Sequence, residues 1–190
     1  MITEKDLENT VIRIFESSQM PEYPYHNLAH TESVVKHTKE IAAYYLLKEP
    51  ERFILTAAAW FHDIGHLYGD MQDHEERGVL IMEYYLQSEP EERIAAISAC
   101  IMATKSPSHP KDLNQQILCD ADTYHFGTDQ FRQTDILVEK EMEMRTAKKN
   151  PHWHKDSLKL LQQHVFFTDY CRDLLTEGKN QNIAWLESLV

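Results

Sequence analysis

The chain is poor in the residues that mark disulfide scaffolds and tight turns. Its 190 residues include only three cysteines, five glycines and seven prolines. Cys100, Cys119 and Cys171 are odd in number, far apart and outside any CxxC motif, so we expect no disulfide framework and favour a reducing compartment. Because turn signals are few and alternating polar–apolar runs are scarce, long helices are favoured over short strands.

Long apolar runs are also missing. The densest one, residues 54–61, is far shorter than the roughly 20 residues that a membrane-spanning helix needs. The opening residues, MITEKD, lack the apolar core of a secretory signal. We therefore expect a soluble, cytoplasmic protein with no membrane partner.

Basic residues are in the minority. The chain has 19 Lys and Arg against 31 Asp and Glu, which gives a net charge of −12 with histidine neutral. Binding to a nucleic-acid duplex or to anionic lipid depends on clustered Lys and Arg, so neither partner is expected. A small anionic substrate stays compatible with this charge, because a bound metal ion can reverse the local potential. The sequence carries no signal for an oligomeric state.

Apolar residues recur at helical spacing, which predicts an all-α protein: a single-domain helical bundle over residues 1–190. Thr3 is a plausible cap of the first helix, and the second helix places His30 on the same face as Val34 and Ile41. The third helix opens after Pro50 and is expected to stop at Gly65. The predicted helices span about 3–18, 28–47, 51–64, 73–88, 90–104, 111–121, 128–147, 154–167 and 180–189, with a loop at 105–110.

Four segments concentrate the residues that carry chemistry. They are YHNLAH at 25–30, HDIGH at 62–66, His74-Glu75 and DAD at 120–122, in a chain with eleven histidines. His30 faces inward, the His62-Asp63 pair follows an apolar run, and Asp122 follows another. A single inward histidine is more often a satisfied core residue. Two imidazoles and two carboxylates on separate apolar helices instead favour a divalent cation with nitrogen and oxygen ligands.

The series His30, His62-Asp63, Asp122 resembles the H…HD…D signature of the HD-superfamily metal-dependent phosphohydrolases, over about residues 25–122. The resemblance implies an all-α HD-type fold, with these four residues as ligands of a divalent ion: Mn, Fe, Co, Ni, Zn or Mg. It also implies hydrolysis of a phosphoester in a nucleotide or a related small phosphorylated molecule. Binuclear members have two further histidines in the interval before the last aspartate. By that likeness Asp63 would bridge two ions, and His74 and His109 would complete the second site.

The segment 25–30 is similar to the YHNxxH motif of cyclic-nucleotide phosphodiesterases, which would make His26 the general acid. The simpler alternative is that Asn27 caps a helix and His26 covers its start. His66 is a second candidate proton donor, or it shields the site. Lys105 is the first candidate to contact a substrate phosphate, because it lies between the expected ligands. No purine-clamping glutamine could be identified, which argues against a cyclic nucleotide. The acidic pair that would follow the HD motif in ppGpp hydrolases is missing too, since residues 64–67 read IGHL.

Two other functions stay open. Some HD-type proteins resemble di-iron oxygenases, and the six ligands would then be His30, His62, Asp63, His74, His109 and Asp122, although the gap from Asp63 to His74 is short for this. The chain could also be a non-catalytic module that senses a nucleotide. Residues 139–145, with alternating charges, are interpreted as a solvated helix face.

Overall fold

The computed structural model describes residues 2–19, 23–106 and 108–190. Within these ranges the chain forms α-helices and two short 3-10 helices and no β-strand, which confirms the all-α prediction. By its internal contacts the chain divides into two compact units. The first comprises helix α1 and residues 26–122, and the second comprises residues 23–25 and 123–190. The expectation of one domain over residues 1–190 stays a prediction.

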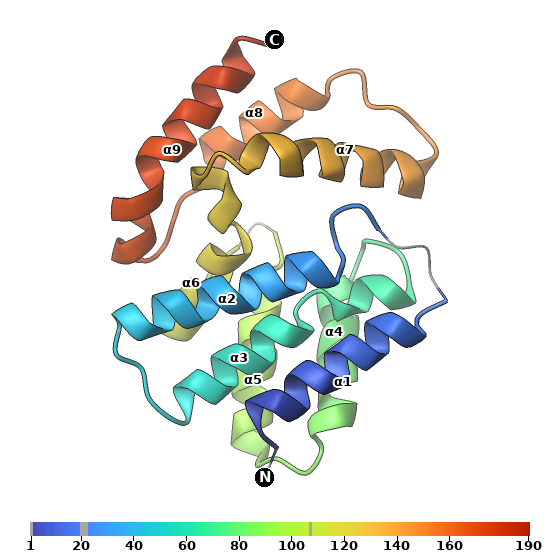
Figure 1. Cartoon of the computed structure of the whole chain (residues 1–190), viewed down its shortest axis with the longest axis vertical. Helices are drawn as coiled ribbons and strands as arrows, with labels where there is room; N and C mark the ends of the chain where they lie inside the picture. Colours follow the sequence, from blue (N-terminus) through green and yellow to red (C-terminus); the bar gives the residue numbers. More distant parts are fainter. Residues whose placement is uncertain (1, 20–22, 107) are drawn as a thin grey trace. The chain divides into compact units, whose positions relative to one another are not determined.

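The first unit is built around one central helix, α3 (Glu51–Phe61), which is largely apolar; Figure 1 shows the helices of this unit. Its elements are α1 (Glu4–Ser17), α2 (Leu28–Tyr44), α3 (Glu51–Phe61), the 3-10 helix η1 (Ile64–Tyr68), α4 (His74–Leu86), α5 (Glu91–Ala103) and α6 (Leu113–Asp122). Every residue of α3 from Phe53 to Phe61 is buried, and α3 contacts α1, α2, α4, α5 and α6. A helix without a polar face can be stable only when neighbours surround it, so α3 forms the core of this unit.

Helix α2 begins as expected and ends earlier than expected. The Asn27 side chain accepts a hydrogen bond from the His30 backbone N–H at 3.1 Å, which confirms the capping interpretation of this residue. The helix stops at Tyr44 because Leu46 adopts a left-handed conformation, with φ of 53°. The N–H groups of Leu46 and Leu47 then bond to the carbonyls of Ala43 and Ala42, which is a Schellman cap. No glycine marks this cap, so it could not be predicted from the sequence.

The expectation that Gly65 ends the third helix is wrong. Helix α3 ends at Phe61, and Gly65 lies inside η1. A Cβ atom at Gly65 would lie 2.0 Å from the carbonyl oxygen of His74. Gly65 is therefore needed for the close packing of η1 against the start of α4, and the turn after α3 is made by His62 and Asp63 themselves.

The second unit contains the 3-10 helix η2 (Tyr124–Gly127), α7 (Phe131–Thr146), α8 (Trp153–Gln163) and α9 (Asp169–Glu187) (Figure 1). Helix α9 packs closely on η2, and a Cβ at Gly178 would lie 2.0 Å from the Gly127 carbonyl oxygen. This helix begins 11 residues before the predicted 180, because Thr168 caps it by accepting from the Cys171 N–H. Helix α8 ends at Gln163 and not at 167.

Helix α7 corrects the interpretation of residues 139–145 as a solvated face. The side chains of Glu141 and Arg145 are only 1% and 8% exposed, and they form an ion pair with each other at 2.7 Å. Opposite charges four residues apart on a helix usually pair at the surface, whereas here they compensate each other in a buried position. Alternating charge along a helix thus did not reveal which side of it was buried.

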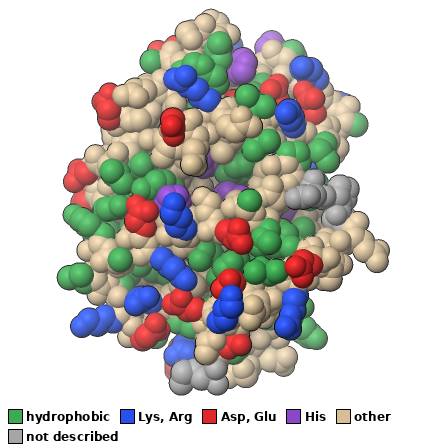
Figure 2. Space-filling model, viewed as in Figure 1, with side chains coloured by type: hydrophobic (Ala, Val, Ile, Leu, Met, Phe, Trp, Pro, Cys, Tyr) green, Lys and Arg blue, Asp and Glu red, His purple; other side chains and the backbone are tan. Residues whose placement is uncertain are grey.

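The distribution of charged side chains on the surface agrees with the excess of acidic residues in the sequence. Figure 2 shows Lys and Arg side chains scattered among Asp and Glu side chains over the visible face, without a large basic patch. In the described part of the chain, no helix is both long enough and apolar enough to cross a lipid bilayer. All three cysteines are buried, and none forms a disulfide, which agrees with the expectation of no disulfide framework.

Candidate metal centre

Four residues from three helix ends converge in the first unit. His30 comes from the first turn of α2, His62 and Asp63 follow α3, and Asp122 is the last residue of α6. One ligand atom from each lies within 4.8 Å of the others. The His30 Nε2 is 3.2 Å from both Asp63 Oδ2 and Asp122 Oδ1, and the His62 Nε2 is 3.2 and 3.6 Å from the same two oxygens. The structure thus brings together the four residues that the sequence predicted as metal ligands.

The protonation of His62 fits a metal ligand. Its ring is fully buried, and its Nδ1 lies 2.8 Å from the Ala59 carbonyl oxygen, to which it donates. Nε2 then carries the lone pair, and within the described residues it makes no hydrogen bond. A lone pair that faces two carboxylate oxygens is repelled by them unless a metal ion lies between or a proton occupies Nε2. A histidine with Nδ1–H bonded to a backbone carbonyl and Nε2 directed at the ion is the usual arrangement at metal sites.

Without a cation, protons on the imidazoles balance the negative charges of the carboxylates in this cluster. Burial alone lowers the pKa values of His30 and His62, but Asp63 and Asp122 raise both, and the pKa of His62 rises well above its ordinary value. Burial raises the pKa values of the two carboxyl groups, but the adjacent imidazoles outweigh burial and lower both. A divalent ion would displace the imidazole protons, so the charges of the cluster suit its binding.

Asp63 also faces a second group of histidines. His26, Asp63 and His66 each offer a ligand atom within 4.8 Å of the others. While Oδ2 of Asp63 faces His30 and His62, its Oδ1 lies 3.9 Å from His66 Nε2 and 3.6 Å from His74 Nε2. The two oxygens of one carboxylate therefore serve two groups, as a bridging carboxylate would. The bridging role of Asp63 stays a prediction.

The second group is a stack of rings. The ring of His66 is stacked on that of His74 with centroids 3.9 Å apart and planes 19° apart, and it lies 4.2 Å from the ring of His26. His74 is fixed by its Nδ1, which lies 2.8 Å from the Met71 carbonyl oxygen. From the sequence, His26 is a candidate proton donor or a cover for the helix start, and His66 a second candidate donor or a shield of the site; neither is predicted to bind a metal. The spacing of Asp63 and His66, one helical turn apart, was the signal that could have grouped them as ligands.

His109 and Lys105 are placed differently from the rest. His109 is exposed and belongs to neither cluster among the described residues. The Lys105 ammonium lies 3.2 Å from Asp73 and also pairs with Glu76, which raises the pKa of Lys105. The structure thus places His74, but not His109, beside Asp63. The metal role of His109 and the phosphate contact of Lys105 stay predictions.

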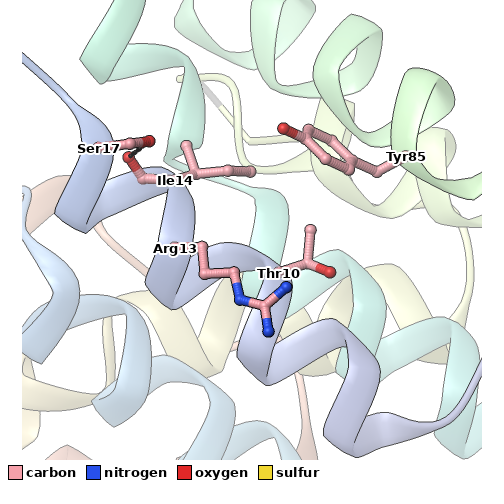
Figure 3. A pocket seen from close by; sticks show the side chains of 5 residues that line it. All are labelled: Thr10, Arg13, Ile14, Ser17 and Tyr85. Carbon is pink, nitrogen blue, oxygen red and sulfur yellow. Dashed lines mark hydrogen bonds between the residues drawn. The ribbon is translucent and has the colours of Figure 1, made fainter.

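The first unit also has a shallow surface pocket (Figure 3). It is lined by Thr10, Arg13, Ile14 and Ser17 of α1 and by Tyr85 of α4, around ≈ 350 Å³ of empty space. None of the clustered histidines lines it. The chemistry of the protein is therefore expected at the histidine clusters and not in this pocket.

Comparison with known families shows to which family the chain belongs. The family model described as the HD domain matches residues 27–127, more than half of the chain. The chain belongs to the HD domain family. The matched segment includes His30, His62, Asp63 and Asp122, and the resemblance expected from these residues is confirmed.

Solved structures share the fold of this HD domain protein. A predicted HD superfamily hydrolase from an uncultured Thermotogales bacterium is 18% identical, with a TM-score of 0.64 over 97% of this chain and 90% of its own. A Lactobacillus plantarum protein is also 18% identical, with a TM-score of 0.69 over 100% of this chain and 97% of its own. At this identity the likeness concerns the fold alone. No curated protein matches the chain.

Proposed function

We propose that this HD domain protein is a metal-dependent phosphohydrolase that cleaves a phosphoester in a nucleotide or a related small phosphorylated molecule. The observation that carries the proposal is the convergence of His30, His62, Asp63 and Asp122 within 4.8 Å. These four residues would hold a divalent ion. When bound, such an ion acts as a Lewis acid that acidifies water and offsets the charge of phosphoryl oxygens.

The protein's own part in the reaction centres on proton transfer. His26 is half-buried, and its ring lies 5.9 Å from that of His30 and 4.2 Å from that of His66. In the proposal, His26 donates a proton from a ring nitrogen to the departing oxygen. General acid help of this kind contributes about 10²–10⁴ in rate. His66 is 1% exposed and packed between two other imidazoles, so it supports the ring of His26 and is the second candidate donor.

Two alternatives use the same site. A cyclic-nucleotide phosphodiester would require the same metal ligands and the same acid, so cyclic nucleotides belong in the substrate panel. A di-iron oxygenase would need His109 as a ligand, and this residue is exposed and outside both clusters. The observed geometry therefore gives more support to hydrolysis than to oxygenation.

The test combines metal analysis with a substrate panel. Purified protein is analysed for metals, stripped with a chelator, and assayed with nucleoside phosphates, cyclic nucleotides and phosphodiesters after each divalent metal is added back. We expect hydrolysis that depends on the metal and falls at least about 10³-fold in Asp63→Ala, since this variant removes the shared carboxylate. Asp129→Ala, at an exposed position, is the matched control and should behave like the wild type.

Three results would overturn the proposal. Full metal content and full activity in Asp63→Ala would remove its structural basis. Oxygen consumption with bound iron and no phosphoester hydrolysis would point to the oxygenase. Tight nucleotide binding without turnover under every metal would identify a sensing module.

A further inference from the structure

Two of the peptide bonds at which the backbone passes between the two units adjoin residues of the site. Tyr25, the last residue of the short segment 23–25 in the second unit, directly precedes His26 in the first. Asp122, the last residue of the first unit, directly precedes Thr123. Whatever holds Tyr25 in the second unit therefore also constrains the backbone of His26.

Helix α7 holds the segment 23–25 through a buried carboxylate. The Tyr25 backbone N–H donates to Oε2 of Glu141 at 3.0 Å, in a buried position. The other oxygen of Glu141, Oε1, accepts from Arg145 at 2.8 Å through Nε and lies 2.7 Å from its Nη2. The Arg145 guanidinium in turn lies 3.6 Å above the centre of the Tyr23 ring. Both oxygens of Glu141 are therefore engaged, one with the backbone of the segment and one with the arginine.

The hydrogen bonds of this network are better suited to positioning the segment 23–25 accurately than to stabilising the fold in general. Glu141 is 1% exposed, and a buried carboxylate is tolerated only when a countercharge and hydrogen bonds satisfy it. Hydrogen bonds to a charged acceptor are short, directional and stronger than neutral ones. The Tyr25 side chain adds a second restraint, with its ring 5.6 Å from that of His125. Tyr25, the residue before His26, is thus restrained through both its backbone and its side chain.

We propose that Glu141 is a positioning residue for His26: it binds the Tyr25 N–H and so sets the backbone from which His26 presents its ring. The inference rests on the proposed function, in which His26 is the proton donor. Misplacement of a reacting group by about 1 Å can reduce a rate 10²-fold, so a hydrogen bond one residue away can matter. His30 has its own support from the Asn27 cap, and the effect of Glu141 is therefore selective for His26 over the metal ligands.

The kinetic test compares Glu141→Gln and Glu141→Leu with Glu143→Gln, a partly exposed control on the same helix. We expect kcat to fall about 10- to 100-fold in Glu141→Leu, with KM and metal content unchanged. Glu141→Gln should lose less, because its amide oxygen can still accept from the Tyr25 N–H. The Gln variant also keeps the test informative if the Leu variant fails to fold.

A double-mutant cycle separates positioning from general structural support. In a His26→Ala background, Glu141→Gln should cause no further loss of kcat, because the group that it positions is gone. Losses that multiply would overturn the inference. Equal losses for substrates with good and poor leaving groups would also overturn it, since a p-nitrophenyl ester needs little help from an acid.

A spectroscopic readout keeps the inference independent of the proposed activity. In zinc-loaded protein, Glu141→Gln should increase hydrogen exchange at the Tyr25 amide about tenfold or more and shift the ring resonances of His26, but not those of His30 and His62. Unchanged His26 resonances would refute the positioning role. If the wild type hydrolyses no phosphoester, the proposed function fails, and these spectra still decide whether Glu141 positions His26.

Discussion

Buried polar side chains in the two units can differ in whether they have partners, as Asp135 and Asn182 of the second unit and His62 of the first show. In the second unit Asp135 accepts from Trp153 Nε1 at 3.0 Å and from Ser157 Oγ at 2.5 Å. Asn182 donates to the backbone carbonyls of Phe126 and Thr128 at 3.0 and 2.7 Å. In the first unit the buried Nε2 of His62 has carboxylates within 3.6 Å but makes no hydrogen bond among the described residues.

The difference separates structural from functional polar groups. A buried group with its partners in place contributes to one unique packing, whereas a buried group without them costs free energy unless something else binds it. Asp135 and Asn182 are complete without any ligand. A cation would complete the interactions of His62, so burial that stabilises the second unit prepares a candidate binding site in the first.

The largest effect is expected when the incomplete group is removed. In His62→Ala the affinity for a divalent ion should fall at least about 10³-fold, or about 4 kcal/mol, because one of four ligands and the orientation of the others are lost. The measurement is metal titration together with the rise in melting temperature on metal addition, which should vanish. Because the melting temperatures with and without metal are compared within the same variant, the destabilisation caused by the cavity at position 62 cancels.

His109→Ala serves as the control for this comparison, since His109 is exposed and outside the clusters. It should bind metal like the wild type. Tight metal binding in His62→Ala would show that His62 is not a ligand and would contradict its contrast with Asp135 and Asn182. Weak metal binding in His109→Ala would support the predicted ligand role of His109.

An intermediate effect is expected when a completed group is removed. Asp135→Ala leaves the Trp153 N–H and the Ser157 hydroxyl without their acceptor, and each such loss costs about 1–3 kcal/mol. The free energy of unfolding, from urea denaturation followed by circular dichroism, should fall by about 3 kcal/mol. Metal affinity should not change. The exposed Asp173→Ala should leave stability unchanged, and a loss of metal binding in Asp135→Ala would contradict the purely structural role.

The smallest effects come from matched helix caps, one in each unit. Asn27→Ala and Thr168→Ala each remove a side-chain acceptor from a helix start and should each lower the free energy of unfolding by about 1 kcal/mol. Only Asn27 bonds to the backbone of a metal ligand, His30, so Asn27→Ala should also weaken metal binding about threefold. Equal metal affinity in the two variants would show that the cap stabilises α2 without positioning His30.

Much of this molecule was predictable from helical periodicity. The spacing of apolar residues predicted the all-α class and most helices, and it placed His30 on the buried side of α2. It failed where no turn residue marks a boundary, as at the left-handed Leu46. It also failed at Gly65, because this glycine serves the close packing of η1 against α4 and does not end a helix.

The sequence by itself determined most helices, the inward direction of His30 and the identity of the four candidate metal ligands, because periodicity reports the direction of a side chain around its own helix. Only the tertiary structure decided that His26 and His66 join Asp63, that His109 does not, and that Glu141 is buried against Tyr25. These contacts join residues as many as 116 positions apart in the sequence, and a local sequence pattern carries no information about such distant contacts.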